Sequence, residues 1–205
     1  MTVTGYSDRV DHALAFAAKH HYQQAWKGSR APYGTSGPNT AIILTRYAQD
    51  EETVVCGILH EVVQDFVREG YTREMLEQRI AAKFGVAVLD TLVAVTERRH
   101  DDDGVEMTAD ERRRDRLERL TGASPRARWV FAAAAVHDGS ALLTDLRRTE
   151  YPEVVWSRFS AGREGTLLLY RQLADRLSEL GFDAPILAEL VRVVDALEET
   201  NAVRR

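Results

Sequence analysis

Apolar residues recur at every third or fourth position along almost the whole chain. The pattern is clearest in the stretches VDHALAFAAKHHYQQAW, MLEQRIAAKFGVAVLDTLVAVT and ILAELVRVVDALEE. This spacing places the apolar side chains on one face of an α-helix, and the alternation typical of a half-buried strand is not seen. The sequence therefore predicts an all-α fold, a single helical bundle of roughly eight to ten helices.

Prolines, glycines and capping residues divide this pattern into segments. Each of the five prolines falls where a helix should begin or a loop should run, and TADE at 108–111 has the form of a capping box. The helices are expected at 7–26, 39–49, 51–68, 72–83, 86–100, 108–120, 125–147, 153–180 with a break near 162–165, and 184–201. The segments 27–39 and 100–107 are expected to be loops.

Composition limits the class of protein. A chain of 205 residues with 44% hydrophobic content is expected to form one domain over residues 1–205, and a net charge of −5 argues against binding to a nucleic acid polymer. The lone cysteine, Cys56, excludes a disulfide framework and is expected to be a buried small hydrophobe. No signal peptide or membrane span is expected, so the cytoplasm is the predicted location and no membrane partner is predicted. Composition leaves a homo-oligomer open.

Polar residues interrupt an apolar helical segment at ILHEVVQD, residues 58–65. On a continuous helix His60, Glu61, Gln64 and Asp65 would lie on a single wall about one turn tall. Imidazole and carboxylate groups suit a transition-metal ion or a proton-transfer site.

Asp138 is the best candidate for a further metal ligand. It follows five small apolar residues in FAAAAVHDGSALL, which carry its carboxylate into a core-facing helix. Burying an unpaired carboxylate is costly, so a partner is expected. Taken singly, His60 can be a hydrogen-bonded core histidine and Asp138 can cap the segment that follows it. Their joint occurrence favours a site.

The order of these motifs resembles the HD-domain hydrolases of the RelA/SpoT type, which include the small alarmone hydrolases. The resemblance covers about 8–177 and leaves 178–205 as a C-terminal helix. Its matching residues in the first motif are His21, Gln24, Lys27, Gly28, Pro32 and Tyr33, and in the second His60 and Asp65. The stretches IAAKFGVAVLDTLVAVTE, VHDGSALLTDL and VWSRFSAGREGTLLLYRQLADRL resemble the later segments of the family.

The resemblance implies removal of the 3′-pyrophosphate from guanosine tetra- or pentaphosphate by an enzyme that holds one divalent ion, usually manganese. By position, the metal ligands would be His60, Glu61 and Asp138, with Ser36 at the place of a lost histidine ligand. The catalytic residues would be Glu61, Gln64 and Asp65. A small anionic nucleotide or other small molecule would contact Trp26, Lys27, Arg30 and Tyr33.

Several of these positions depart from the family pattern. Serine is a weak replacement for imidazole, and an amide at Gln64 cannot act as a general base. The sequence therefore predicts a divergent phosphohydrolase for a nucleotide pyrophosphate or related phosphate ester, with a divalent metal or with none. It leaves two alternatives: a catalytically degenerate module that binds a nucleotide or a partner, and a metal-free acid/base enzyme on another metabolite.

Other basic residues and histidines could also contribute to the same site. The helix ERRRDRLERL at 111–120 has the alternating charges of a solvated face, and Arg98 and Arg99 are better phosphate candidates. A substitute metal ligand from another histidine is not favoured. His137 in particular should point about 100° away from Asp138 on a helix.

Overall fold

The computed structural model describes residues 5–21, 35–63 and 72–202, and within these ranges all regular structure is helical apart from one isolated bridge between His100 and Glu106. The elements are α1 (Asp8–His21), α2 (Ser36–Arg46), α3 (Glu51–Leu59), α4 (Arg73–Phe84), α5 (Val86–Val95), α6 (Ala109–Thr121), α7 (Pro125–Arg148), α8 (Pro152–Trp156), α9 (Gly162–Glu179) and α10 (Pro185–Ala202). The predicted all-α bundle is confirmed.

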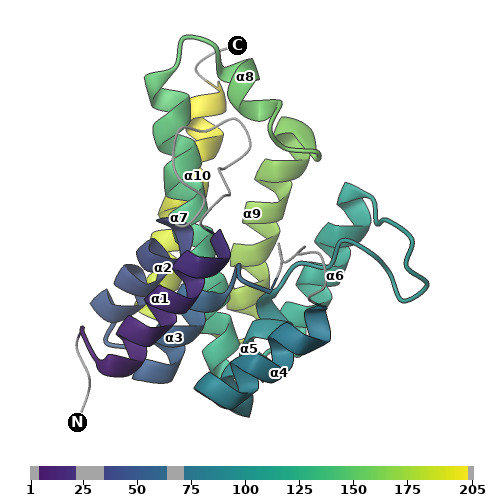
Figure 1. The fold of residues 1–205 in the computed structure, drawn as a ribbon. Coiled ribbons are helices and arrows are strands. Elements are labelled where there is room, and N and C mark those ends of the chain that lie inside the picture. The colour runs from purple at the N-terminus through teal and green to yellow at the C-terminus, as the bar shows by residue number, and fades with distance from the viewer. Residues whose placement is uncertain (1–4, 22–34, 64–71, 203–205) are drawn as a thin grey trace.

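Helix α7 packs against most of the other helices (Figure 1). It packs against α2, α3 and α5 along one part of its surface and against α9 and α10 along another. Its middle turns are lined by small buried residues, Ala132 to Ala135, which let neighbouring helices approach closely. Gly139 continues this contact, because a Cβ there would lie 2.7 Å from Cγ1 of Val193 on α10.

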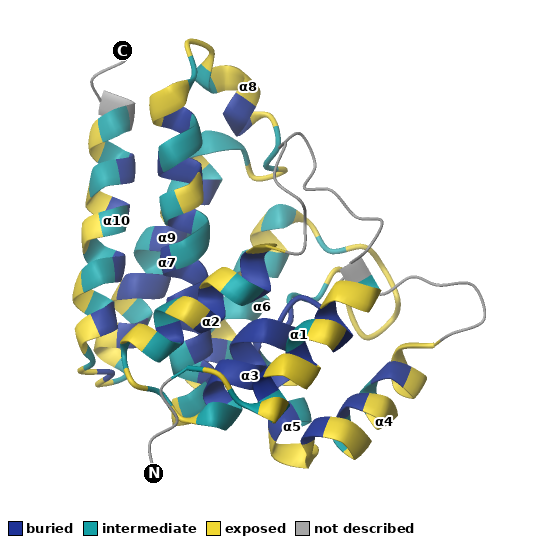
Figure 2. Ribbon diagram, turned by 60° about the vertical axis from the view of Figure 1, so that its left-hand side comes forward, coloured by how far each residue is buried: buried dark blue, intermediate teal, exposed yellow. Residues whose placement is uncertain are grey.

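Helix α3 is buried along its length between α1, α2 and α7 (Figure 2). Every residue from Thr53 to Leu59 is buried, including Cys56, whose thiol pKa is raised by burial to about 12. The expectation that this cysteine is a buried small hydrophobe is confirmed. Gly57 lets α2 approach, because a Cβ there would lie 2.5 Å from Cδ1 of Leu44.

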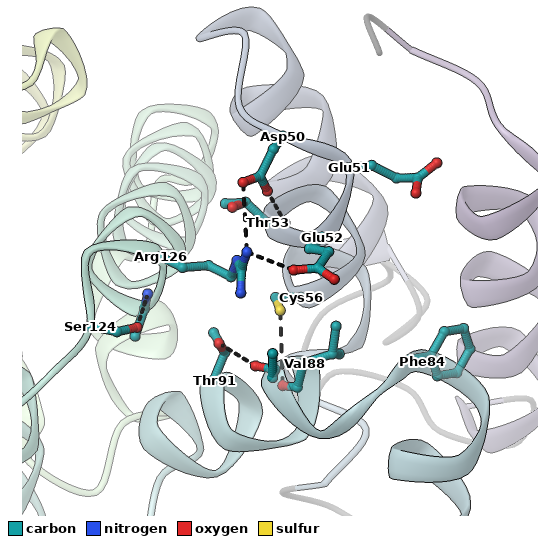
Figure 3. Close-up of polar contacts among 12 residues, drawn as sticks. Asp50, Glu51, Glu52, Thr53, Cys56, Phe84, Val88, Thr91, Ser124 and Arg126 are labelled. Carbon is teal, nitrogen blue, oxygen red and sulfur yellow. Dashed lines mark hydrogen bonds and ion pairs between the residues drawn. The ribbon is translucent and has the colours of Figure 1, made fainter. Parts of the chain in front are cut away.

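Polar contacts fix the start of α3 to the start of α7 (Figure 3). Asp50 is the N-cap of α3 and accepts a hydrogen bond of 2.7 Å from the backbone N–H of Thr53. Arg126, in the first turn of α7, forms ion pairs with Glu52 at 2.7 Å and Asp50 at 3.7 Å. These contacts set the register in which the far end of α3 faces the middle of α7.

Helix boundaries differ from the predicted ones in three places that bear on the site. Helix α2 begins at Ser36 rather than at residue 39, and α5 ends at Val95 rather than at residue 100. Helix α3 ends at Leu59, although the pattern predicted helix to residue 68. A break within 153–180 is present, but it lies at residues 157–161, between α8 and α9, and not at the predicted 162–165. Among the described residues, no helix is long and apolar enough to span a membrane.

Candidate functional site

Polar side chains from α2, from the end of α3 and from α7 meet at the edge of the apolar core, where Asp138 is partly exposed. Ser36 opens α2 and is fully buried. His60 and Glu61 follow the last residue of α3, and each is only 9% exposed. Asp138 lies in the middle of α7, and its charge acts on both His60 and Glu61. The structure thus brings together the four residues that the sequence placed at the metal site.

His60 terminates α3 and has a defined tautomer. Its Nδ1 lies 2.7 Å from the backbone oxygen of Gly57, and because a carbonyl can only accept, Nδ1 carries the proton. In a longer helix that carbonyl would accept the amide of Glu61 instead. Burial lowers the pKa of His60, so the ring is neutral at physiological pH and Nε2 presents a lone pair.

The prediction that the polar residues of 58–65 share one helical wall is therefore wrong for its first two members. His60 and Glu61 lie in a turn beyond α3, where the amide of Val62 bonds back to the carbonyl of Leu59 at 2.9 Å. Their proximity comes from this turn and not from helical spacing. Gln64 and Asp65 lie outside the described residues.

Glu61 is a carboxyl group that holds its proton at neutral pH. Burial, the largest cause, and the negative charge of Asp138 together raise its pKa to about 8, against the opposing effect of a hydrogen bond with the Ser36 side chain. Its Oε1 lies 4.0 Å from Nε2 of His60. A proton donor and a proton acceptor therefore stand next to each other.

His137 is drawn into the same cluster. Its Nδ1 lies 3.0 Å from Oδ1 of Asp138 and 3.5 Å from Oγ of Ser36, and its Nε2 lies 3.3 Å from Nδ2 of Asn39. The expectation that His137 points away from Asp138 is wrong, because both side chains bend from α7 toward the start of α2. With Nδ1–H donated to Asp138, Nε2 accepts from the Asn39 amide, so both ring nitrogens are engaged.

Other predicted site residues are placed elsewhere or not described. The predicted ligand-binding residues Trp26, Lys27, Arg30 and Tyr33 lie outside the described residues. His20 bonds to the carbonyl of Phe16 in its own helix, and His100 lies in the exposed loop after α5. Arg98 is paired with Asp102 and Asp115.

The donor types at this site suit a divalent cation, but their placement does not. Among the described residues, no three side chains of His, Cys, Asp or Glu are positioned to share one ion. Oδ1 of Asp138 is already in contact with Nδ1 of His137. The Ser36 hydroxyl lies where the resemblance implies an imidazole ligand. The described residues therefore do not fit the manganese ion that the resemblance implies.

Sequence reasoning missed three residues that the structure adds to the site. Asn39 contacts His137, and Tyr170 of α9 is buried where the charge of Asp138 reaches it. Burial and that charge both raise the pKa of Tyr170. The third residue, Arg116 of α6, acts electrostatically on His60 and on Tyr170. Nothing in the helical pattern distinguishes these three from ordinary helix residues.

The all-helical bundle holds its His and carboxylate cluster between the end of α3 and the middle of α7. A family model described as "HD domain" matches residues 13–178, close to the 8–177 expected from the resemblance. The chain therefore belongs to the HD-domain family, whose members are generally metal-dependent hydrolases. No curated protein matches the sequence.

Two solved structures share the fold. One, described as a metazoan ortholog of SpoT that hydrolyzes ppGpp and plays a role in starvation responses, is 24% identical with a TM-score of 0.68, and the match covers 93% of this chain and 96% of the other. The second is lmo0812 from Listeria monocytogenes EGD-e, 22% identical with a TM-score of 0.63, with 82% of this chain and 99% of the other covered. At these identities, the likeness establishes the fold alone.

Proposed function

We propose that this protein is a divergent phosphohydrolase of the HD type that acts on a nucleotide pyrophosphate or a related phosphate ester. The observation that carries the proposal is that buried Ser36, His60 and Glu61 meet partly exposed Asp138 within the stretch that the family model matches. The fold shared with a ppGpp hydrolase supports this class of substrate and makes guanosine-3′,5′-bis(diphosphate) the first compound to test.

The proposed chemistry uses His60 as the proton acceptor and Glu61 as the proton donor. A water attacks the phosphorus, and its proton passes to the free Nε2 of His60. The bond to the leaving oxygen breaks, and that oxygen takes the proton of Glu61, which is still bound at neutral pH. The charge of Asp138 favours the protonated form of Glu61, and the hydrogen bond with the Ser36 hydroxyl orients the Glu61 carboxyl group.

Further roles in proton transfer and ligand binding are proposed, from the sequence, for residues outside the described ranges. Asp65 is proposed as a second proton acceptor, beside Gln64, which cannot take a proton. The ligand would be held by Lys27, Arg30 and Tyr33, with Trp26 stacked on a base.

A second candidate function is binding of the same class of ligand without turnover. It is favoured by the Ser36 side chain, which engages Glu61 and His137 where the resemblance implies a metal ligand. A site that keeps its ligand-binding residues but holds no cation would bind a nucleotide and release it unchanged.

One experiment separates these functions. Purified protein is mixed with guanosine-3′,5′-bis(diphosphate), with and without Mn²⁺, while pyrophosphate release and binding heat are both measured. Hydrolysis that is lost in His60→Ala and Glu61→Gln, with binding retained, supports the phosphohydrolase. Binding without release of pyrophosphate supports the second candidate, and absence of both rejects the two together.

A further inference from the structure

Asp138 needs a partner for its negative charge. Its side chain is only 25% exposed, and a carboxylate so far removed from water is unfavourable unless a cation or a hydrogen-bond donor faces it. The resemblance to the HD-domain hydrolases implies a divalent ion in this role, and the described residues do not fit that ion. In this chain an imidazole faces the carboxylate instead, since Nδ1 of His137 lies 3.0 Å from Oδ1 of Asp138.

The imidazole of His137 lies at the place of the lost histidine ligand. Ser36 stands where the resemblance implies that ligand, and its hydroxyl oxygen lies 3.5 Å from Nδ1 of His137. Ser36 opens α2 and is fully buried, whereas His137 comes from the middle of α7. A serine side chain is smaller than a histidine side chain, so it leaves room for a ring from another helix. An imidazole is therefore present at this position, but α7 supplies it instead of α2.

His137 is held as a hydrogen-bond donor and not as a metal ligand. Its Nε2 lies 3.3 Å from the amide nitrogen of Asn39, which donates to it, so the ring proton is on Nδ1 and is donated to Asp138. A histidine binds a metal ion through an unprotonated ring nitrogen, and both nitrogens of His137 are already engaged. His60 is the contrast, because it donates Nδ1–H to the carbonyl of Gly57 and keeps a lone pair on Nε2.

We propose that His137 replaces the divalent ion as the partner of Asp138, so that the candidate site works without a metal. His137 is then a positioning residue, which fixes the Asp138 carboxylate through one hydrogen bond while Asn39 fixes the ring. The proton transfers proposed for His60 and Glu61 need no metal. This role of His137 rests on the proposed function only for the ligand of the site, and metal binding tests it with no ligand present.

The first test measures Mn²⁺ binding to the full-length protein without a nucleotide. His137→Ala removes the donor and frees Oδ1 of Asp138, while His60 and Glu61 stay available as further ligands. We expect the Mn²⁺ affinity, measured by calorimetry with MnCl₂, to rise by at least about tenfold, since changes next to a metal ligand commonly alter affinity by about 10- to 100-fold. Adding Asp138→Ala to His137→Ala should abolish the gain.

His137→Asn is the matched control for this test. Its side-chain amide can still donate to Asp138 from nearly the position of Nδ1, so the Mn²⁺ affinity should stay at the wild-type level. Unchanged affinity in His137→Ala overturns the role proposed for His137. A gain of the same size in both variants also overturns it, because the gain would then come from a loosened core and not from the freed carboxylate.

An exposed residue replaces His137 in the test if His137→Ala does not fold. Asn39 is exposed, and Asn39→Ala removes only the hydrogen bond that holds Nε2 of the ring. We then expect the Mn²⁺ affinity to rise by about fivefold, the usual net contribution of one hydrogen bond. An Asn39→Ala protein with the wild-type affinity overturns the role of His137.

The second test compares the wild type in EDTA and in Mn²⁺, with guanosine-3′,5′-bis(diphosphate) as the probe. Pyrophosphate release, or binding heat where nothing is released, should be the same in both conditions. Hydrolysis or binding that requires Mn²⁺ overturns the metal-free site and leaves the proposed function standing. Absence of both hydrolysis and binding rejects the proposed function, and the Mn²⁺ affinities of the variants still decide the role of His137.

Discussion

Nδ1 of His137 lies 3.0 Å from Oδ1 of Asp138, although the two residues are consecutive on α7. The contact engages the carboxylate that the family resemblance gives to a metal ion. Nε2 of the same ring lies 3.3 Å from the Asn39 amide, so the imidazole is held from both sides. An internal N–H donor thus occupies one oxygen of Asp138 that a bound cation would need.

Restoring the family residues should create a metal site. The triple variant Ser36→His, Glu61→Asp and Gln64→Glu returns an imidazole ligand, shortens the carboxylate next to His60 and supplies a general base. We expect it to bind Mn²⁺ more than about tenfold more tightly than the wild type. Losing a residue that only supports a metal ligand already costs about 10- to 100-fold in affinity, and a residue that binds the ion directly contributes at least as much. Metal content after dialysis and calorimetry with MnCl₂ measure the change.

The matched control adds Asp138→Ala to the triple variant and should abolish the gained affinity. A triple variant that is folded by circular dichroism yet remains free of metal would show that Ser36 does not correspond to the lost ligand. If the wild-type protein binds manganese as tightly as the triple variant, the finding that its described residues do not fit this ion is wrong.

The fold could be predicted because its determinants are local. Spacing of apolar residues, prolines at helix starts and the capping box at Thr108 each act within a few residues, and all are present in the helices observed. The end of α3 could not be predicted in this way. It depends on the His60 side chain taking the Gly57 carbonyl, a choice that apolar periodicity does not record.

The candidate site was predictable only in part, for a related reason. The resemblance pointed to Ser36, His60, Glu61 and Asp138, and the structure brings these residues together. Contacts between distant helices were not predictable. The sequence pattern around an arginine at a partly exposed helix position is the same whether or not the side chain meets a carboxylate. Arg116 is such a case, since only tertiary packing distinguishes it from its paired neighbours on α6.

Glu61 should make the protein less stable as the pH rises. Its pKa is about 8 in the folded chain against 4.5 for the free side chain, so between these values the folded state binds the extra proton. The contribution of Glu61 to stability is then fully present below about pH 4.5, falls through this window by at most about 1.4 kcal/mol per pH unit, and changes no further above about pH 8. Urea unfolding of the wild type and of Glu61→Gln from pH 5 to pH 9 isolates the effect as their difference. Parallel curves would contradict it.

Gly37 should tolerate no side chain. A Cβ at this position would lie 2.3 Å from the backbone oxygen of Ile58, so α2 would have to move away from α3. We expect Gly37→Ala to reduce the free energy of unfolding by about 1–3 kcal/mol, the usual cost of overpacking. Gly122→Ala is the control, since its Cβ would have no atom closer than 4.0 Å, and it should change stability by less than about 0.5 kcal/mol. Equal effects of the two substitutions would show that α2 and α3 are not in close contact.

Asp50 should stabilise α3 in a manner that depends on its charge. Burial opposes its ionisation, but hydrogen bonds from Thr53 and the charge of Arg126 outweigh this and lower its pKa. Its contribution is therefore fully present above the unfolded value of 3.8 and is lost as the pH falls through the folded value. Asp50→Ala should cost about 1 kcal/mol at pH 7, the usual value of an N-cap, and the difference from the wild type should shrink in acid.

Asp50→Asn keeps a capping oxygen without the charge. Its stability at pH 7 should therefore lie between those of the wild type and Asp50→Ala, and should depend less on pH. Chemical unfolding at pH 7 and pH 3 tests this, and an Asp50→Ala deficit that is equal at both values would show that the cap acts without its charge.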